Sequence, residues 1–285
     1  MIPSAEPKRF FKGCAKPGPL LAPERELPPV AEGESLDALC GDLRLYQLKN
    51  GHRFSTDDIL TGWYGTTWCS TARTILDLGS GIGTVATIAA WRCPGAQLVT
   101  IEAQAESVRL ARKSAIHNLL SNRMEIREGD FRDPQVLGED ERFNLVFGSP
   151  PYFPLEAGVL GDHPQKIACR FEVRGEIADY GRVAAAHLDW GGVFACVFPV
   201  RPTEQHDRVK AAAAAAGLTV VRWRPVILKE GEEPLLGLFV MTRSDHLPEW
   251  FRGQTWAEPP LIIRTREGGI HPEYRAVKLA FGFPP

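Results

Sequence analysis

The stretch Thr74–Gly83, TILDLGSGIG, combines a short apolar run with a glycine-rich turn. The apolar residues predict a buried strand, and the pattern that begins at Thr84 predicts a helix directly after the turn. A strand that passes through a glycine turn into a helix is the local structure in which proteins bind nucleotide-like cofactors. The stretch therefore predicts a cofactor site at the end of this strand.

Two acidic residues near the turn narrow the choice of cofactor. Asp77 lies two residues before the first glycine, where its carboxylate can face a cationic amino group. Glu102 ends the next predicted strand, 19 residues after Gly83, where it can accept both ribose hydroxyls. S-adenosylmethionine has an α-amino group and no phosphate, whereas a nicotinamide or flavin dinucleotide would place its pyrophosphate near Asp77. The two acids therefore favour S-adenosylmethionine over a dinucleotide or a purely structural turn.

Further cofactor contacts are expected from the turn and from the strand ends beside it. Gly79 can supply an unusual backbone angle, Gly81 a close approach to the ligand, and Gly83 close packing of helix and strand. Asp130, after the third strand, can accept a hydrogen bond from the adenine amino group or cap a following helix. The residues expected at the cofactor are Asp77, Gly79, Ser80, Gly81, Gly83, Glu102, Ala103, Gly129, Asp130 and Phe131.

From Thr74 onward, predicted strands and helices alternate along the chain. Strands are expected at 74–78, 97–102, 124–128, 144–148 and 193–198, and helices at 84–92, 105–120, 177–188 and 204–216. This alternation predicts a parallel sheet with helical crossovers. Two further strands, 219–228 and 236–242, are joined by a short polar loop and therefore pair antiparallel. The predicted fold is α/β, a Rossmann-like class I methyltransferase sheet, mostly parallel with a closing antiparallel hairpin.

The stretch Leu145–Phe153, LVFGSPPYF, contains the end of the predicted strand 144–148 and the loop that follows it. We call residues Ser149–Tyr152 of this loop the Pro-Pro corner. Two consecutive prolines cannot continue a central strand, so they predict a stiff loop. An exocyclic aromatic amine is a poor nucleophile, because its lone pair is delocalised into the ring. Hydrogen bonds from that amine to the Ser149 hydroxyl and the Pro150 carbonyl would free the lone pair, while Tyr152 stacks on the ring. Ser149, Pro150, Pro151 and Tyr152 are therefore the expected catalytic residues for methylation of an amino group.

On these motifs the chain resembles the class I amino-methyltransferases with an (Asn/Asp/Ser)-Pro-Pro-(Tyr/Phe) signature. More narrowly, it is similar to bacterial adenine-N6 methyltransferases of valine tRNA, from Ser35 to about Arg243. The resemblance implies a tRNA or other RNA substrate, and it places the segment Phe54–Asp58, with Phe54 and Asp58 as cofactor-binding residues, beside the methionine end of the cofactor. Phe153, Arg170 and Arg174 follow the Pro-Pro corner and are expected to contact the substrate, although a solvated, salt-bridged surface is an equal alternative for the arginines.

Ser149 departs from that family, because the tRNA enzymes usually carry Asn at this position. Ser-Pro-Pro-Tyr is typical of cytosine-N4 DNA methyltransferases, so the target base stays open. Other methyl acceptors compatible with the motifs are a small molecule, a protein glutamine and a DNA base. A catalytically inactive RNA-binding scaffold is the alternative that is not an enzyme.

Composition limits the partners and the compartment of the protein. The 285-residue chain has a net charge of −2, so nucleic-acid binding would depend on a local basic patch. Its six cysteines form no CxxC pair, which suits a reducing cytoplasm, and its histidines show no metal-ligand spacing. No apolar run approaches the roughly 20 residues of a membrane-spanning helix. We expect a cytoplasmic monomer or homodimer without a metal or membrane contact.

The chain divides by composition into three parts. Residues 1–33 form a proline-rich arm, residues 34–245 the methyltransferase domain, and residues 246–285 a C-terminal extension. The domain begins with a hairpin and helix, residues 34–70, in which Asn50-Gly51 predicts the hairpin turn and Ser55 the start of the helix. Trp250 and Trp256 are expected to anchor the extension in the core, with stacking on bases as the alternative.

Overall fold

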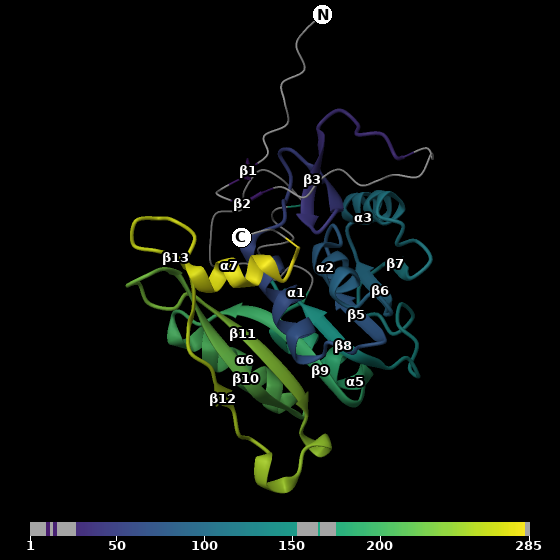
Figure 1. Cartoon of the computed structure of the whole chain (residues 1–285). Helices are drawn as coiled ribbons and strands as arrows, with labels where there is room; N and C mark the ends of the chain where they lie inside the picture. The colour runs from purple at the N-terminus through teal and green to yellow at the C-terminus, as the bar shows by residue number, and fades with distance from the viewer. Residues whose placement is uncertain (1–9, 12–13, 16–26, 153–164, 166–174, 283–285) are drawn as a thin grey trace, which may run out of the picture.

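The computed structural model describes residues 10–11, 14–15, 27–152, 165 and 175–282 (Figure 1). The strands are β1 (Phe10–Phe11), β2 (Cys14–Ala15), β3 (Glu34–Cys40), β4 (Leu43–Leu48), β5 (Thr74–Leu78), β6 (Gln97–Glu102), β7 (Met124–Glu128), β8 (Phe143–Gly148), β9 (Leu188–Pro199), β10 (Leu218–Lys229), β11 (Leu236–Arg243), β12 (Trp256–Ala257) and β13 (Leu261–Arg264). The α-helices are α1 (Thr56–Trp68), α2 (Thr84–Arg92), α3 (Ala105–His117), α5 (Ile177–His187), α6 (Thr203–Ala215) and α7 (Pro272–Leu279), and single 3₁₀ turns form at Ser244–His246 and Glu249–Phe251.

The central sheet has nine strands in the order β12-β10-β11-β9-β8-β5-β6-β7, with β13 also paired to β10. Strands β5 to β9 run parallel, while β11 pairs antiparallel with both β9 and β10. The predicted α/β fold with a closing antiparallel hairpin is therefore confirmed. In register, Leu78 of β5 pairs with Ile101 of β6 and Gly148 of β8. The glycine turn and the Pro-Pro corner consequently leave the sheet side by side.

Helices cover both faces of the sheet and divide its apolar side chains into two cores (Figure 1). Ile75 and Phe147 belong to the core beneath α1 and α2. Leu76, Leu78 and Val146 alternate with them and belong to the core beneath α5 and α6. Because both faces are covered, these strands are apolar at almost every position, as expected for buried parallel strands.

The N-terminal hairpin exists, but its turn is not at Asn50-Gly51. The hairpin joins β3 to β4, and the chain reverses at Gly41-Asp42, where Gly41 has a φ of +50°. A Cβ atom at Gly41 would collide with the indole of Trp91, so the turn also needs the missing side chain. Asn50-Gly51 instead ends β4 and leads the chain toward α1. The predicted turn was wrong, because an earlier glycine already satisfied the hairpin.

The C-terminal segment extends the sheet. Strands β12 and β13 pair parallel with β10, and the Tyr64 hydroxyl of α1 donates to Glu258 at 2.6 Å. Trp250 and Trp256 are 73% and 62% exposed, so their expected anchoring in the core is wrong. The division of the chain at residues 33 and 245 stays a prediction.

Candidate functional site

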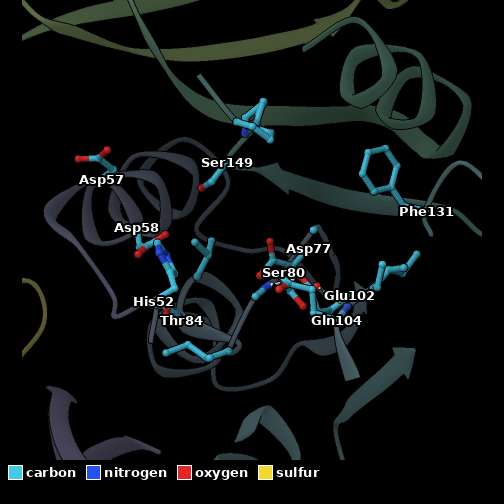
Figure 2. Close-up of a pocket in the computed structure, with 18 of the residues that line it drawn as sticks. His52, Asp57, Asp58, Asp77, Ser80, Thr84, Glu102, Gln104, Phe131 and Ser149 are labelled. Carbon is cyan, nitrogen blue, oxygen red and sulfur yellow. Dashed lines mark hydrogen bonds between the residues drawn. The ribbon is translucent and has the colours of Figure 1, made fainter. Parts of the chain in front are cut away.

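A cavity of about 660 Å³ lies at the carboxyl edge of the parallel strands (Figure 2). It is bounded by the start of α1, the glycine turn, the ends of β6 and β7, the Pro-Pro corner and α5. The expected site residues that line it are Asp58, Asp77, Gly79, Ser80, Gly81, Glu102, Ala103, Gly129, Asp130, Phe131, Ser149, Pro150, Pro151 and Tyr152. The tertiary structure therefore brings both motifs to one cavity.

The glycine turn leaves open space where a ligand can approach the main chain. Gly79, Gly81 and Gly83 all have positive φ, at +62°, +56° and +81°. A Cβ at Gly79 would collide with the Tyr180 hydroxyl, whereas a Cβ at Gly81 would meet no atom within 4 Å. Gly83 does not line the cavity and instead packs near Ala111 of α3, 3.4 Å from an added Cβ. Gly81 is thus the position where the turn admits a ligand.

Two carboxylates hold the turn in shape through main-chain hydrogen bonds. Asp77 accepts the N–H of Ala86, in α2, at 3.1 Å. Glu102 accepts the N–H groups of Gly81 at 2.8 Å and Gln104 at 2.7 Å. A carboxylate oxygen can accept more than one hydrogen bond, so Glu102 retains capacity for ribose hydroxyls. Both acids therefore shape the turn and still face the cavity.

The electrostatics of the cavity favour a cationic ligand. Burial, together with the charges of Asp58 and Glu102, raises the pKa of Asp77 to about 8. Burial likewise raises the pKa of Asp58 to about 6. Arg53 also lines the cavity, but its guanidinium pairs with Asp37 at 3.0 Å. An ammonium or sulfonium group would offset the mutual repulsion of these acids, so the residues present fit S-adenosylmethionine.

The side of the cavity expected to hold adenine is lined by two aromatic rings and by Asp130. The Phe131 and Tyr180 rings lie 4.5 Å apart between centroids, tilted by 54°. Asp130 forms an ion pair with Arg132 at 2.6 Å and also accepts the Arg132 N–H at 2.9 Å. Residues 131–142 form turns without a helix, so the alternative of Asp130 as a helix cap is wrong. Any contact of Asp130 with adenine would share its carboxylate with Arg132.

The Pro-Pro corner presents one unused polar group. The Ser149 hydroxyl is buried and has no hydrogen-bond partner within the described part of the chain. Figure 2 shows it directed into the space bordered by Asp58 and Asp77. Tyr152 donates its hydroxyl to Asp57 at 2.7 Å, and its ring meets Phe198 edge-on at 5.8 Å. A buried hydroxyl without a partner is costly, so this corner is suited to receive a ligand N–H group.

Some expected residues lie elsewhere. Phe54 is absent from the cavity lining, packs against the core beneath α1, and donates its N–H to Gln47 at 2.8 Å. Phe153, Arg170 and Arg174 lie outside the described residues. Ser55 and Asp57, from the expected segment Phe54–Asp58, do line the cavity. Lining residues that the sequence did not single out are Gly51, His52, Arg53, Ile82, Thr84, Val85, Ile101, Gln104 and Tyr180. The acidic first turn of α1 was a signal for Asp57, whereas no sequence pattern pointed to Tyr180.

Comparison with known proteins agrees with this geometry. Residues 66–159 match the family model of the methyltransferase small domain. A tRNA1(Val) (adenine(37)-N6)-methyltransferase from Bacteroides thetaiotaomicron is 29% identical over 199 residues, which cover 67% of this chain and 76% of that protein. A protein of the same name from Shewanella amazonensis is 27% identical, covering 68% and 80%.

The fold also matches solved methyltransferase structures. A predicted O-methyltransferase from Agrobacterium tumefaciens has a TM-score of 0.59 at 20% identity, covering 79% of this chain and 96% of that one. At that identity the match carries the architecture alone. Together with the family model and the curated relatives, it confirms that the chain resembles class I methyltransferases. The protein is a methyltransferase, and its methyl donor is S-adenosylmethionine.

Proposed function

We propose that this protein transfers a methyl group from S-adenosylmethionine to the N6 amino group of an adenine in tRNA. The observation that carries the proposal is the buried Ser149 hydroxyl, which has no partner among the described residues and borders a cavity lined by acids. Curated relatives that align with about two thirds of the chain are named for adenine-N6 methylation of a tRNA. The amino group named for these relatives is the kind of hydrogen-bond donor that the Pro-Pro corner is suited to receive.

Within the cavity, each side has its own task. S-adenosylmethionine supplies an electrophilic methyl group when it is bound. Asp77 would hold the ammonium end of that cofactor through opposite charge, and Glu102 would accept hydrogen bonds from its ribose. Gly81 leaves room for its main-chain contacts. These residues place the methyl donor at the carboxyl edge of β5, one strand away from the Pro-Pro corner.

The Pro-Pro corner orients the acceptor. A base in a tRNA loop must leave its stack to enter the cavity. Its amine then donates one N–H to Ser149 and the other to the Pro150 carbonyl, while the Tyr152 ring stacks on the base. These bonds would localise the nitrogen lone pair, so that it can form the new bond to carbon while sulfur keeps the electron pair of the breaking bond from sulfur to carbon. The proton would pass from the methylated nitrogen to solvent afterwards, so no strong base is required.

Cytosine N4 is the second candidate acceptor. Ser149 is the observation that favours it, because Ser-Pro-Pro-Tyr is typical of enzymes that methylate this amine. The hydrogen-bonding requirement at the corner is the same for both bases. The two acceptors differ in ring size, so the methylated nucleoside itself distinguishes them.

The test is methylation with tritium-labelled cofactor. Unmodified tRNA transcripts, DNA of the same sequence, and the protein and small-molecule fractions of a cell extract are each incubated with the enzyme. We expect label in the tRNA, recovered as N6-methyladenosine after hydrolysis to nucleosides, and loss of that label with Ser149→Ala. Label in N4-methylcytosine, in protein or in small molecules would overturn the adenine assignment.

We infer a cytoplasmic location from the proposed tRNA substrate. Separately, no helix in the described residues is both long and apolar enough to cross a membrane.

A further inference from the structure

The hydrogen bond between Tyr152 and Asp57 joins two parts of the chain that are 95 residues apart. Tyr152 ends the Pro-Pro corner, and Asp57 lies in the first turn of α1. Both residues line the cavity, so the bond connects the first turn of α1 to the Pro-Pro corner at the cavity wall. It therefore links α1 of the N-terminal hairpin-and-helix segment to the Pro-Pro corner.

The carboxylate of Asp57 is not needed to cap α1. The helix cap is made by Ser55, whose hydroxyl accepts the Asp57 N–H at 3.2 Å, and by Asp58, which accepts the Ser55 N–H at 2.8 Å. These bonds complete a capping box without the Asp57 side chain. The Asp57 side chain instead accepts the Tyr152 hydroxyl at 2.7 Å.

Tyr152 is held at several points. Its backbone follows two prolines, which restrict the main chain on one side. Its carbonyl accepts the side-chain amide of Gln205 at 3.4 Å, and its ring lies edge-on to Phe198. These contacts locate the residue, but an edge contact still allows a ring to tilt and slide. The hydroxyl bond to Asp57 is the contact that sets the far end of the ring.

The charge state of this pair suits a durable hydrogen bond. Burial raises the pKa of the Tyr152 hydroxyl well above its ordinary value, and Asp57 adds to that rise. The phenol therefore stays protonated and donates. Burial also raises the pKa of Asp57, whereas the Tyr152 hydroxyl opposes that rise by stabilising the carboxylate. Bonds from a neutral donor to a carboxylate are stronger than bonds between neutral groups.

We propose that Asp57 is a positioning residue, which fixes the ring plane of Tyr152 so that the acceptor base stacks with its amine facing Ser149 and the methyl donor. This role rests on the proposed methyltransferase function and assigns a hydrogen-bond partner in α1 to its stacking residue. The proposal gives Asp57 no proton to take and no cofactor group to hold. Asp57 should therefore affect turnover only through the geometry of the Tyr152 ring.

Three variants separate positioning from the other roles open to a carboxylate in this cavity. Asp57→Asn keeps an oxygen that accepts the Tyr152 hydroxyl, Asp57→Ala removes it, and Tyr152→Phe removes the donor while keeping the ring. We expect Asp57→Ala and Tyr152→Phe each to lower kcat by about 10-fold, with KM for cofactor within 2-fold of wild type, since one such bond contributes roughly that factor. Asp57→Asn should stay within about 3-fold of wild type and keep its pH profile.

The double variant Asp57→Ala/Tyr152→Phe provides the decisive comparison. If the two groups act only through their shared bond, the double variant loses no more than either single variant. Losses that multiply would overturn the proposal. So would an Asp57→Asn variant as slow as Asp57→Ala, which would indicate proton transfer, or a loss of cofactor affinity in Asp57→Ala, which would indicate a cofactor ligand.

A matched control and a readout without turnover complete the test. Glu204→Ala removes an exposed first-turn acid from α6, and its activity should equal that of wild type. With 3-fluorotyrosine incorporated, the fluorine resonance of Tyr152 should shift in Asp57→Ala and return in Asp57→Asn. An unmoved resonance overturns the inference even if the acceptor proves not to be tRNA. Absence of tRNA methylation by the wild type would count against the proposed function alone.

Discussion

The glycine turn and the Pro-Pro corner leave neighbouring strands at the same edge of the sheet, yet they are stabilised differently. The turn is held by carboxylates that accept main-chain N–H groups, as Asp77 and Glu102 do. The corner is held by proline rings and by contacts of Tyr152, and its hydroxyl at Ser149 has no partner in the described chain. We therefore propose that charge selects the ligand on one side of the cavity and that neutral hydrogen bonding selects it on the other.

Among the predicted changes, we expect Asp77→Asn to have the largest effect, a loss of cofactor affinity. The amide still accepts the Ala86 N–H, so the turn keeps its shape while its charge is lost. We expect cofactor affinity, measured by calorimetry, to fall at least about 100-fold, the usual range for removing one partner of a buried charge pair. Asp207→Asn, which removes an exposed carboxylate from α6, should change affinity by less than about 2-fold. Unchanged binding by Asp77→Asn would contradict a charge-selected ligand.

Substitution of the two serines that line the cavity tests whether its two sides have different roles. The hydroxyls of Ser149 and Ser80 are both buried and both without a partner among the described residues. Ser149→Ala should lower kcat by about 10- to 100-fold and spare cofactor affinity, since the hydroxyl acts on the reacting amine. Ser80→Ala should weaken cofactor binding and leave kcat at saturating cofactor unchanged. Equal effects of both substitutions on kcat would show that the two sides are not distinct.

Gly81→Ala tests the open space in the turn. Gly191 is its control, because it also has a positive φ, +70°, with no atom within 4 Å of an added Cβ, and it lies at the opposite edge of the sheet. Both substitutions should reduce the free energy of unfolding by about 1 kcal/mol through backbone strain. Thermal denaturation measures that shared cost. Only Gly81→Ala should also raise the dissociation constant of the cofactor, by about 10-fold, because its methyl group enters the cavity.

The pH dependence of stability gives the smallest effect. A carboxyl group whose pKa is raised by folding, to about 8 for Asp77, stabilises the protein fully below its unfolded pKa and loses that contribution as the pH rises toward 8. Asp77→Asn carries no such group. Its melting temperature without cofactor should therefore gain on that of wild type between pH 5 and pH 8. A constant difference across that range would show that Asp77 is already ionised at pH 5.

Much of the sheet was predictable because burial repeats along the sequence. The bounds expected for β5, β6, β7 and α2 agree with the structure residue for residue. Short buried strands, and a helix such as α2 in which residues 84–90 are all buried, are predictable from apolar runs in the local sequence. The hairpin turn was misplaced because Asn-Gly and Gly41-Asp42 are both good turn sequences, and the choice depends on what β3 pairs with.

Local patterns in the sequence were sufficient to predict the order of the elements and the two motifs, and through them the type of methyl donor and an amino group as its acceptor. Which distant side chains complete the cavity depends on the tertiary fold. Tyr180 closes against Gly79, and Asp57 receives the Tyr152 hydroxyl from 95 residues away. The periodicity of apolar residues indicates whether a residue is buried. These contacts depend instead on how α1 and α5 pack across the ends of the strands, and no local sequence pattern encodes that packing.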